Sequence, residues 1–187
     1  MAADTVKSAS ITTLDGAPQN ATSPTQLTEG AGAAGRLVDH SDYVVMTTGG
    51  LASTSSTYKM LRLPTSCTLK LARLFTKSGL DSSTGLAIDL GAYYSDSTVD
   101  GTPYSLQGTL ISATCFVSNK AFGQSGAGSE IDALSNLDAN LRTSPLWAQV
   151  GLATDPGGYI DIVMAVHTVA SGTATAGNVA LTAETVN

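Results

Sequence analysis

The sequence has 187 residues, of which 42% are hydrophobic and only 13% are charged, and its formal net charge at pH 7 is −6. Roughly 25% of the residues of a typical soluble domain are charged, so this chain owes its polarity mainly to Ser and Thr. The hydrophobic share excludes global disorder, the acidic pI of about 4.6 argues against nucleic-acid binding, and no apolar run is long enough to cross a membrane.

The first part of the chain, residues 1–36, differs in composition from the rest. Its apolar positions, among them Val6, Ile11 and Leu14, are scattered between Ser, Thr, Asn and Pro without a sustained period, and it ends in a segment of Gly and Ala that can serve as a hinge. We therefore expect an extended N-terminal arm over residues 1–36 and one domain over 37–187. Because no basic region leads into an apolar stretch at the start, we expect synthesis in a cytosol.

Strand signals dominate the domain. Runs rich in β-forming residues, mostly bounded by Gly, Pro, Asp or Ser, predict seven or eight strands. They lie at about residues 43–48, 58–63, 69–74, 86–94, 109–117, 160–167 and 179–184. Alternation is clearest in 86–94, where Leu90 and Tyr94 share one face and Tyr93 lies on the other. The pattern predicts an all-β fold, an antiparallel β-sandwich resembling a jelly roll.

Helix signals are few and fall in the long connection between residues 118 and 158. Apolar residues spaced by three and four predict a short amphipathic helix over Ser129–Leu141. Ser144 followed by Pro145 predicts the cap and first turn of a second short helix. The glycine-rich segment 123–128 is expected to be a flexible loop.

The two cysteines, Cys67 and Cys115, both lie in strand-like runs. We expect buried free thiols, with a disulfide as the alternative. No Cys-x-x-Cys pair suggests a zinc or redox site.

Few residues suggest chemistry, and we predict no catalytic, cofactor-binding or metal-binding residues. His40 has Ser and Asp neighbours in sequence, but a triad needs groups from separated segments, so this stretch is expected to be a polar turn. His167 is expected to face outward from a strand. Asp96 begins a segment similar to a calcium loop, but the twelfth position is Gln107, which cannot supply the bidentate carboxylate, so a turn is expected.

Three stretches together resemble a family of small structural proteins of tailed-bacteriophage virions. They are ADTVKS (3–8) with ITTLD (11–15), YSDSTVDGTPYSLQG (94–108), and PLWA (145–148) with TDPGGYIDIV (154–163). The resemblance implies a non-enzymatic capsid decoration, or cement, protein with a jelly-roll fold and no cofactor. Its expected partners are the major capsid protein and neighbouring copies of itself in a homo-oligomer. The expected location is the capsid surface of a virion, after synthesis in the host bacterial cytoplasm.

Partner contacts are predicted for two parts of the chain. In the arm, Val6, Ile11 and Leu14 are expected to fix the register of a strand added to a neighbour's sheet edge. The aromatic side chains of Tyr93 and Trp147 are candidate anchors on a neighbouring subunit, with packing in the core or at the rim as the alternative.

Two other functions remain open at this point. One is a receptor- or glycan-binding module of a head or tail fibre, since β-sandwiches also serve as lectins. The other is a hydrolase of cell-wall or capsular sugars, for which Asp89 and Asp161 are the best available acids because they lie on strands that could be neighbours.

Overall fold

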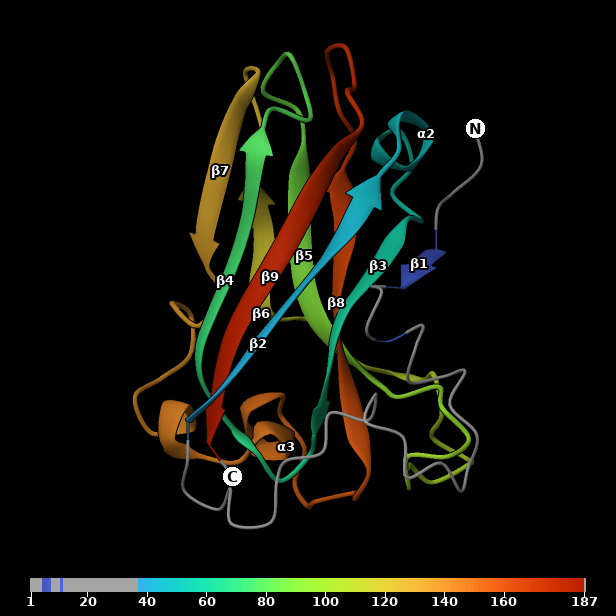
Figure 1. Ribbon diagram of the computed structural model, residues 1–187, viewed down its shortest axis with the longest axis vertical. Coiled ribbons are helices and arrows are strands. Elements are labelled where there is room, and N and C mark those ends of the chain that lie inside the picture. Colours follow the sequence, from blue (N-terminus) through green and yellow to red (C-terminus); the bar gives the residue numbers. More distant parts are fainter. Residues whose placement is uncertain (1–4, 8–10, 12–36, 187) are drawn as a thin grey trace.

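Two β-sheets pack face to face in the computed structural model, which describes residues 5–7, 11 and 37–186 (Figure 1). The five-stranded sheet has the order β1 (Thr5–Lys7), β3 (Thr57–Pro64), β8 (Tyr159–Thr168), β5 (Ala87–Tyr94), β6 (Leu110–Ala121). The four-stranded sheet has the order β2 (Leu37–Met46), β9 (Gly177–Val186), β4 (Thr68–Ser78), β7 (Ala127–Asp132). The predicted all-β sandwich is confirmed.

The strand pairing is that of a jelly roll. β2 pairs with β9, β3 with β8, β4 with β7 and β5 with β6, all antiparallel, so the second half of the domain retraces the first. Further pairing of β4 with β9 and of β5 with β8 closes this long ribbon into two sheets. β1 is additional to this scheme and runs parallel to β3.

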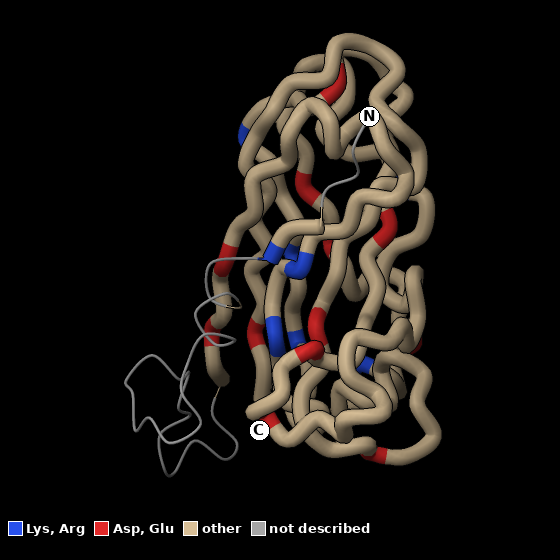
Figure 2. The backbone as a smooth tube through the Cα atoms, turned by 90° about the vertical axis from the view of Figure 1, so that its right-hand side faces the viewer, with Lys and Arg blue, Asp and Glu red and all other residues tan. Residues whose placement is uncertain are grey.

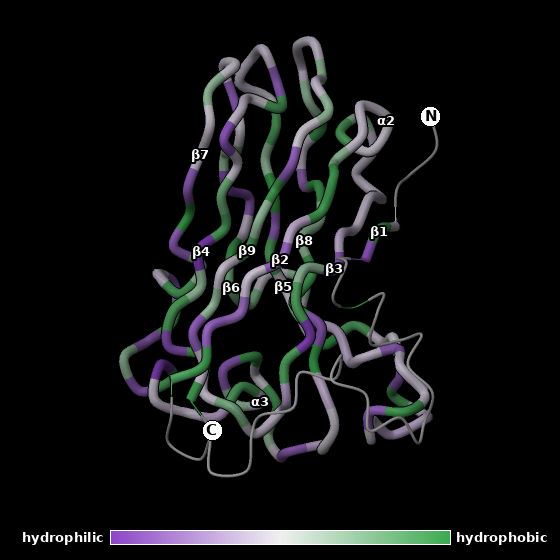
Figure 3. The backbone as a smooth tube through the Cα atoms, viewed as in Figure 1, coloured by the Kyte–Doolittle hydropathy of each residue, from purple (hydrophilic) through white to green (hydrophobic). Residues whose placement is uncertain are grey.

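Side-chain alternation explains how the sheets bury their core. In β9, Val179, Leu181 and Ala183 are buried, while the residues between them are partly exposed. Figure 3 shows the same alternation of hydrophobic and hydrophilic positions along β4. Since successive strand residues point to opposite faces, such segments bury one face against the other sheet.

The helix predicted over Ser129–Leu141 is wrong. Of the loop predicted over 123–128, residues 123–126 do lie between strands, but β7 already begins at Ala127. β7 pairs with β4, with Ile131 opposite Leu74. The chain then turns, because the Asp132 carboxylate accepts a hydrogen bond from the Leu134 backbone N–H at 3.0 Å. Ile131 and Leu134 both reach the core, so the helical spacing reflects burial along a strand and the turn that follows it.

Within residues 37–186, three short helical segments lie at the ends of the sandwich: α2 (Thr48–Leu51), η1 (Leu141–Thr143) and α3 (Leu146–Gln149). α3 matches the second predicted helix, but Pro145 occupies its N-cap, and the Ser144 hydroxyl donates to the Asn140 carbonyl instead of capping α3. No helix in the described ranges is long and apolar enough to span a membrane.

Asp81 ties together two loops at one end of the sandwich. Its carboxylate is fully buried and accepts five backbone N–H groups at 2.9–3.1 Å, from Ser83, Gly85, Leu86, Ser171 and Gly172. Burial by itself would raise the pKa of Asp81, but these hydrogen bonds outweigh it, and the pKa lies below its usual value. This one side chain therefore fixes loops some 90 residues apart in sequence.

Candidate functional site

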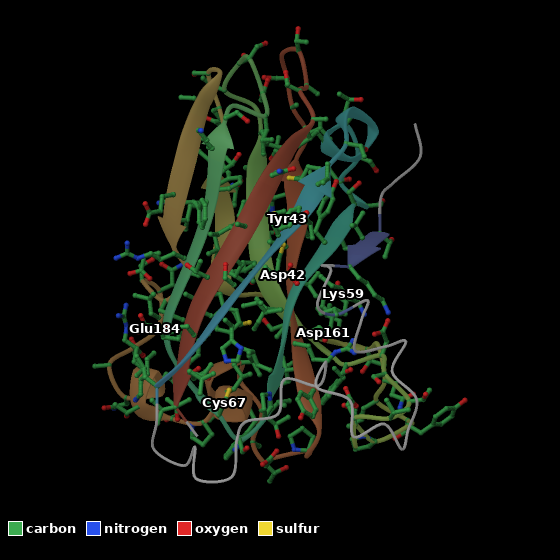
Figure 4. The ribbon with its side chains drawn as sticks, viewed as in Figure 1. Asp42, Tyr43, Lys59, Cys67, Asp161 and Glu184 are labelled. Carbon is green, nitrogen blue, oxygen red and sulfur yellow. The ribbon has the colours of Figure 1, made fainter. Side chains whose placement is uncertain are left out.

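Ionised side chains gather on the side of the molecule where β1 meets β3, the side that Figure 2 views directly. We call this set the ion cluster. Its members are Lys7 of β1, Lys59 and Arg62 of β3, Asp161 of β8, and Asp96 and Asp100 of the loop after β5. Lys59 and Asp161 lie close together on neighbouring strands (Figure 4).

The centre of the ion cluster is the pair formed by Arg62 and Asp161. These residues are directly opposite each other in the β3–β8 register. Arg62 Nε donates to Asp161 Oδ1 at 2.6 Å and Nη2 donates to Oδ2 at 3.0 Å, a bidentate geometry. Asp161 is 0% exposed, and Lys59 Nζ lies 3.2 Å from its Oδ2. Every polar atom of this buried carboxylate therefore has a cationic partner.

Asp96 joins the loop after β5 to both β3 and β1. Its Oδ1 accepts from Arg62 at 2.8 Å, and its Oδ2 lies 2.8 Å from Lys59 Nζ and 2.7 Å from Lys7 Nζ. Partial burial would raise the pKa of Asp96, but hydrogen bonds and charge from Lys59 and Lys7 reverse this effect. Its pKa consequently lies far below the usual range.

Within the part of the chain that the structure describes, the ion cluster contains three cations and three carboxylates. Asp100 completes it, with Oδ2 4.0 Å from Arg62 Nε and Oδ1 accepting from the Thr102 backbone N–H. Lys7 brings the charge of β1 to this cluster through its contact with Asp96.

The segment predicted to be an arm contains β1, which joins the five-stranded sheet. Three residues pair with β3, and Val6 lies opposite Tyr58 and packs against the hydrophobic core. Ile11 is 0% exposed, and four residues span at most about 14 Å, so its burial site is close to β1. Leu14 lies outside the described residues. Val6 and Ile11 thus face inward within this chain, and their role in binding a neighbour stays a prediction.

The two aromatic candidates are both half-buried. Tyr93 lies opposite Asp161 in the β5–β8 register, on the face turned away from the core. Trp147 lies in α3, where its backbone N–H donates to the Thr65 carbonyl at 3.1 Å. Their contacts with a neighbouring subunit stay predictions.

Asp89 and Asp161 do lie on adjacent strands, but they do not form an acid pair. Asp89 is opposite Ala165, four residues from Asp161, which separates the two carboxylates by about 13 Å along the sheet. Asp89 accepts from the Asn119 backbone N–H at 2.7 Å and lies 2.8 Å from His167 Nδ1. Glycosidase carboxylates are about 5–10 Å apart, so this arrangement does not suit sugar hydrolysis.

His40 is not in a turn as predicted but in the middle of β2, because this stretch pairs along its whole length with β9. Its Nε2 lies 2.9 Å from the Thr185 hydroxyl, and burial lowers its pKa despite the opposing charge of Asp39. Ser41 points to the opposite face of the strand. The neighbouring Ser and His therefore do not meet.

The segment that begins at Asp96 contains the expected turn, at Asp100-Gly101: the Asp100 carboxylate accepts a hydrogen bond from the Thr102 backbone N–H, and Gly101 has a φ of 83°. Cys67 and Cys115 are thiols and are not joined in a disulfide; Cys67 is buried as expected, whereas Cys115 is only partly buried, and desolvation raises the pKa of its thiol to about 12. Among residues 5–7, 11 and 37–186, no group of three or more His, Cys, Asp or Glu could hold a metal ion.

A second surface feature lies on the outer face of the four-stranded sheet. Tyr43 and Phe75 lie on either side of Ala180 in the strand register, and they are 52% and 39% exposed. Val45, two residues along β2, is also exposed. We call Tyr43, Val45 and Phe75 the apolar stripe; it is contiguous apolar surface on a sheet face that could contact a partner.

Sequence reasoning missed the ion cluster. Lys59 and Arg62 interrupt an otherwise apolar strand, and Asp161 interrupts another. Charged residues at such positions are buried only when they are paired, so these interruptions of the apolar pattern indicate buried ion pairs. The pairing itself depends on β3 lying beside β8, and the two partners are 99 positions apart in the sequence.

Two solved structures share this fold over most of the chain. A chain of the cyanophage Pam1 capsid asymmetric unit matches with a TM-score of 0.51 and 16% identity, over 89% of this protein and 97% of that chain. A chain of the capsid of Ralstonia phage GP4 matches with a TM-score of 0.54 and 12% identity, over 88% of this protein and 92% of that chain. No protein-family model and no curated protein matches the sequence. What these proteins share is the fold and an approximately equal length.

Proposed function

We propose that this protein is a non-enzymatic structural protein of a bacteriophage virion, and that it decorates the outside of the capsid as a cement protein. The observation that carries the proposal is the likeness, over almost the full length of both partners, to chains from two phage capsids. Those chains consist almost entirely of this fold, as this one does. Its partners would be the major capsid protein and other copies of itself.

The way the protein uses its acidic residues supports a structural role. Asp81 holds loops together, Asp161 binds Arg62 and Lys59, and Asp89 binds a backbone N–H and His167. A general acid or base needs a carboxylate that can exchange protons with a substrate. Each of these carboxylates is instead held by groups of the protein.

The surface also supports assembly. A protein that is 13% charged loses few hydrated ions when its faces meet another surface. The apolar stripe offers Tyr43 and Phe75 as side chains of the kind enriched at interface centres. Many copies, each bound weakly on a repeating lattice, would together stabilise a shell.

The first experiment is to count this protein in purified virions by quantitative mass spectrometry against the major capsid protein. A lattice protein is expected in hundreds of copies, because a closed shell repeats its binding site at every symmetry-related position. A few copies per particle would indicate a tail component, and complete absence would overturn the virion role.

The second experiment tests the surface. Capsids lacking this protein are incubated with purified wild type or with a Tyr43→Ser, Phe75→Ser double variant, and occupancy is measured. We expect at least a tenfold loss of affinity, since two aromatic side chains leave the contact. The matched control is Val99→Ser with Leu110→Ser, which removes exposed apolar side chains elsewhere. Trp147→Ala and Tyr93→Ala extend the test to the other candidate anchors.

One observation favours the receptor- or glycan-binding alternative. Tyr104, in the loop after β5, is 86% exposed, and exposed aromatic rings are suited to stacking on other flat or apolar groups. Binding to host cells or glycans that is lost in Tyr104→Ala, together with no binding to capsids, would favour that function over decoration.

A further inference from the structure

We propose that the loop between β5 and β6, residues 95–109, is a preformed docking knob that inserts the ring of Tyr104 into an uncharged apolar pocket of a protein partner. The inference rests on the proposed function for the identity of that partner, the capsid shell protein. Its structural basis is the exposure of Tyr104, the hydrogen bonds that brace the loop, and the internal engagement of the polar side chains of the loop.

Tyr104 is the most exposed of the large hydrophobic side chains in the described part of the chain. It is 86% exposed, and the next such side chain, Leu37, is 59% exposed. An aromatic ring left in water gains free energy when a partner buries it. In Figure 1 the docking knob, drawn in yellow-green, projects to the lower right of the strands, so a partner can reach the ring.

One amide joins the two halves of the docking knob. Gln107 Nε2 donates to the Ser97 carbonyl at 2.8 Å and to the Thr102 carbonyl at 3.4 Å. The Thr102 hydroxyl in turn accepts the Tyr159 backbone N–H at 3.1 Å, which joins the docking knob to the first residue of β8. Ser97 and Thr102 are both buried. The loop is therefore packed against itself and against the five-stranded sheet.

The tip of the docking knob is a β-turn with Tyr104 at its second position. The Leu106 backbone N–H donates to the Pro103 carbonyl at 2.8 Å, which closes the turn. The Thr109 hydroxyl donates to the Leu106 carbonyl at 2.7 Å and connects the end of the turn to the start of β6. Tyr104 is thus held between fixed backbone contacts, and a partner has little conformational entropy to remove when it binds the ring.

The polar side chains of the docking knob favour a protein pocket over a glycan. The Asp96 carboxylate binds Arg62, and the Asp100 carboxylate accepts a backbone N–H of the same loop and lies 4.0 Å from Arg62. The Gln107 amide donates to two carbonyls of the loop. A glycan needs such groups for its hydroxyls, because a buried hydroxyl without a partner is costly. The apolar pocket of a protein needs none of them.

The docking knob is a surface separate from the apolar stripe. It connects β5 and β6 of the five-stranded sheet, whereas the stripe lies on β2 and β4 of the other sheet. Because the two surfaces share no residue, we expect substitutions in them to weaken binding independently.

The test is the binding of Tyr104→Ser to capsids that lack this protein, measured as occupancy against concentration beside the wild type. The side chain is exposed, so the substitution leaves the fold intact. We expect at least tenfold weaker binding, because an aromatic anchor is removed. Tyr104→Phe keeps the ring and is expected to retain most of the affinity. The matched control, Leu110→Ser, removes an exposed apolar side chain outside the loop and is expected to change the affinity by less than about twofold.

The outcomes separate this inference from the proposed function. Equal capsid binding by the wild type and Tyr104→Ser overturns the docking knob and leaves the proposed function standing. Wild type that binds no capsid shows that the proposed function and the partner named for the docking knob are both wrong. If Tyr104→Ser loses binding to host cells or glycans and keeps its binding to capsids, the ring contacts a carbohydrate and the inference is overturned.

The bracing of the loop has its own test. Gln107→Ala leaves Tyr104 in place but removes the amide that joins the two halves of the docking knob. The loop must then be ordered on binding, so we expect about fivefold weaker capsid binding and faster hydrogen exchange at the Leu106 N–H. In the Tyr104→Ser background, Gln107→Ala should have little further effect. Wild-type affinity in Gln107→Ala, despite faster exchange, would show that binding does not depend on a preformed loop.

Discussion

Asp161 and Asp81 illustrate how this protein uses its few charged residues. Both carboxylates are fully buried, and each is bound from several sides, Asp161 by two cations and Asp81 by five backbone N–H groups. A buried ion is stable only when its hydrogen-bonding capacity is filled. Replacing either Asp by Asn, which exchanges one carboxylate oxygen for an amide nitrogen, should therefore lower the free energy of unfolding substantially.

The first prediction concerns Asp161→Asn. The amide keeps the shape of the side chain but leaves Arg62 and Lys59 facing a neutral group, so we expect the free energy of unfolding to fall by about 3 kcal/mol. Urea denaturation measures the difference. Asp138→Asn, at an exposed position, should change the same quantity by less than about 0.5 kcal/mol. Equal effects in the two variants would contradict the role given to the ion pair.

The second prediction concerns pH and Asp81. Because the pKa of Asp81 is lowered by folding, the unfolded chain binds its proton more readily, and the stabilisation is present above about pH 4 and lost as pH falls through the folded-state pKa. Asp81→Asn removes acceptors for several N–H groups and should cost about 2–4 kcal/mol at neutral pH.

The measurement is urea denaturation of wild type and Asp81→Asn between neutral pH and about pH 3. The stability difference between them should shrink as the pH is lowered, since wild-type Asp81 becomes protonated. A difference that stays constant would mean that Asp81 does not act through its charge. Asp138→Asn again serves as the control, with a small difference from wild type at every pH.

Among the elements, β6 has the most irregular pairing. Leu90 and Ala92 of β5 are two residues apart, but their partners on β6, Val117 and Ser112, are five apart. The extra residues of β6 bulge over Gly91, where an added Cβ would lie 2.3 Å from the Ser112 carbonyl oxygen. Such close backbone approach requires glycine.

The third prediction follows from this bulge. Gly91→Ala should lower the free energy of unfolding by about 2–4 kcal/mol, because the methyl group meets backbone atoms that cannot move aside without breaking the β5–β6 pairing. Thr114→Ala, at an exposed position in the bulge itself, should have an effect below about 0.5 kcal/mol. Thermal and urea denaturation of both variants provide the comparison, and an unaffected Gly91→Ala would mean that the bulge is readily displaced.

The elements also show where local patterns stop being informative. A strand with one buried face, such as β9, could be predicted because its alternation is a local property. β7 could not, because its edge position on β4 and the turn at Asp132 give apolar residues the spacing of a helix. Ile131 and Leu134 would reach the core from a helix as well as from a strand followed by a turn, so the spacing of apolar residues alone does not distinguish the two structures.

On the scale of the whole molecule, the low charge content leads to a prediction about binding. If the protein decorates a capsid through apolar and hydroxyl-bearing faces, its affinity should change by less than about threefold between about 50 mM and 500 mM salt. Occupancy of capsids across a salt series measures this. A steep loss of binding with salt would show that ion pairs hold the protein to the shell, against the interpretation of the apolar stripe.

The sequence by itself determined the fold class, the low content of charged residues relative to Ser and Thr, and the position of most strands. The charge content follows from composition, and the strands follow from the two-residue period of a half-buried strand. Only the tertiary structure decided which strands are neighbours, that β1 runs parallel to β3, and that Arg62 meets Asp161. Those contacts join residues far apart in the chain, and their distances are fixed by the rolled topology of the two sheets, which no local pattern encodes.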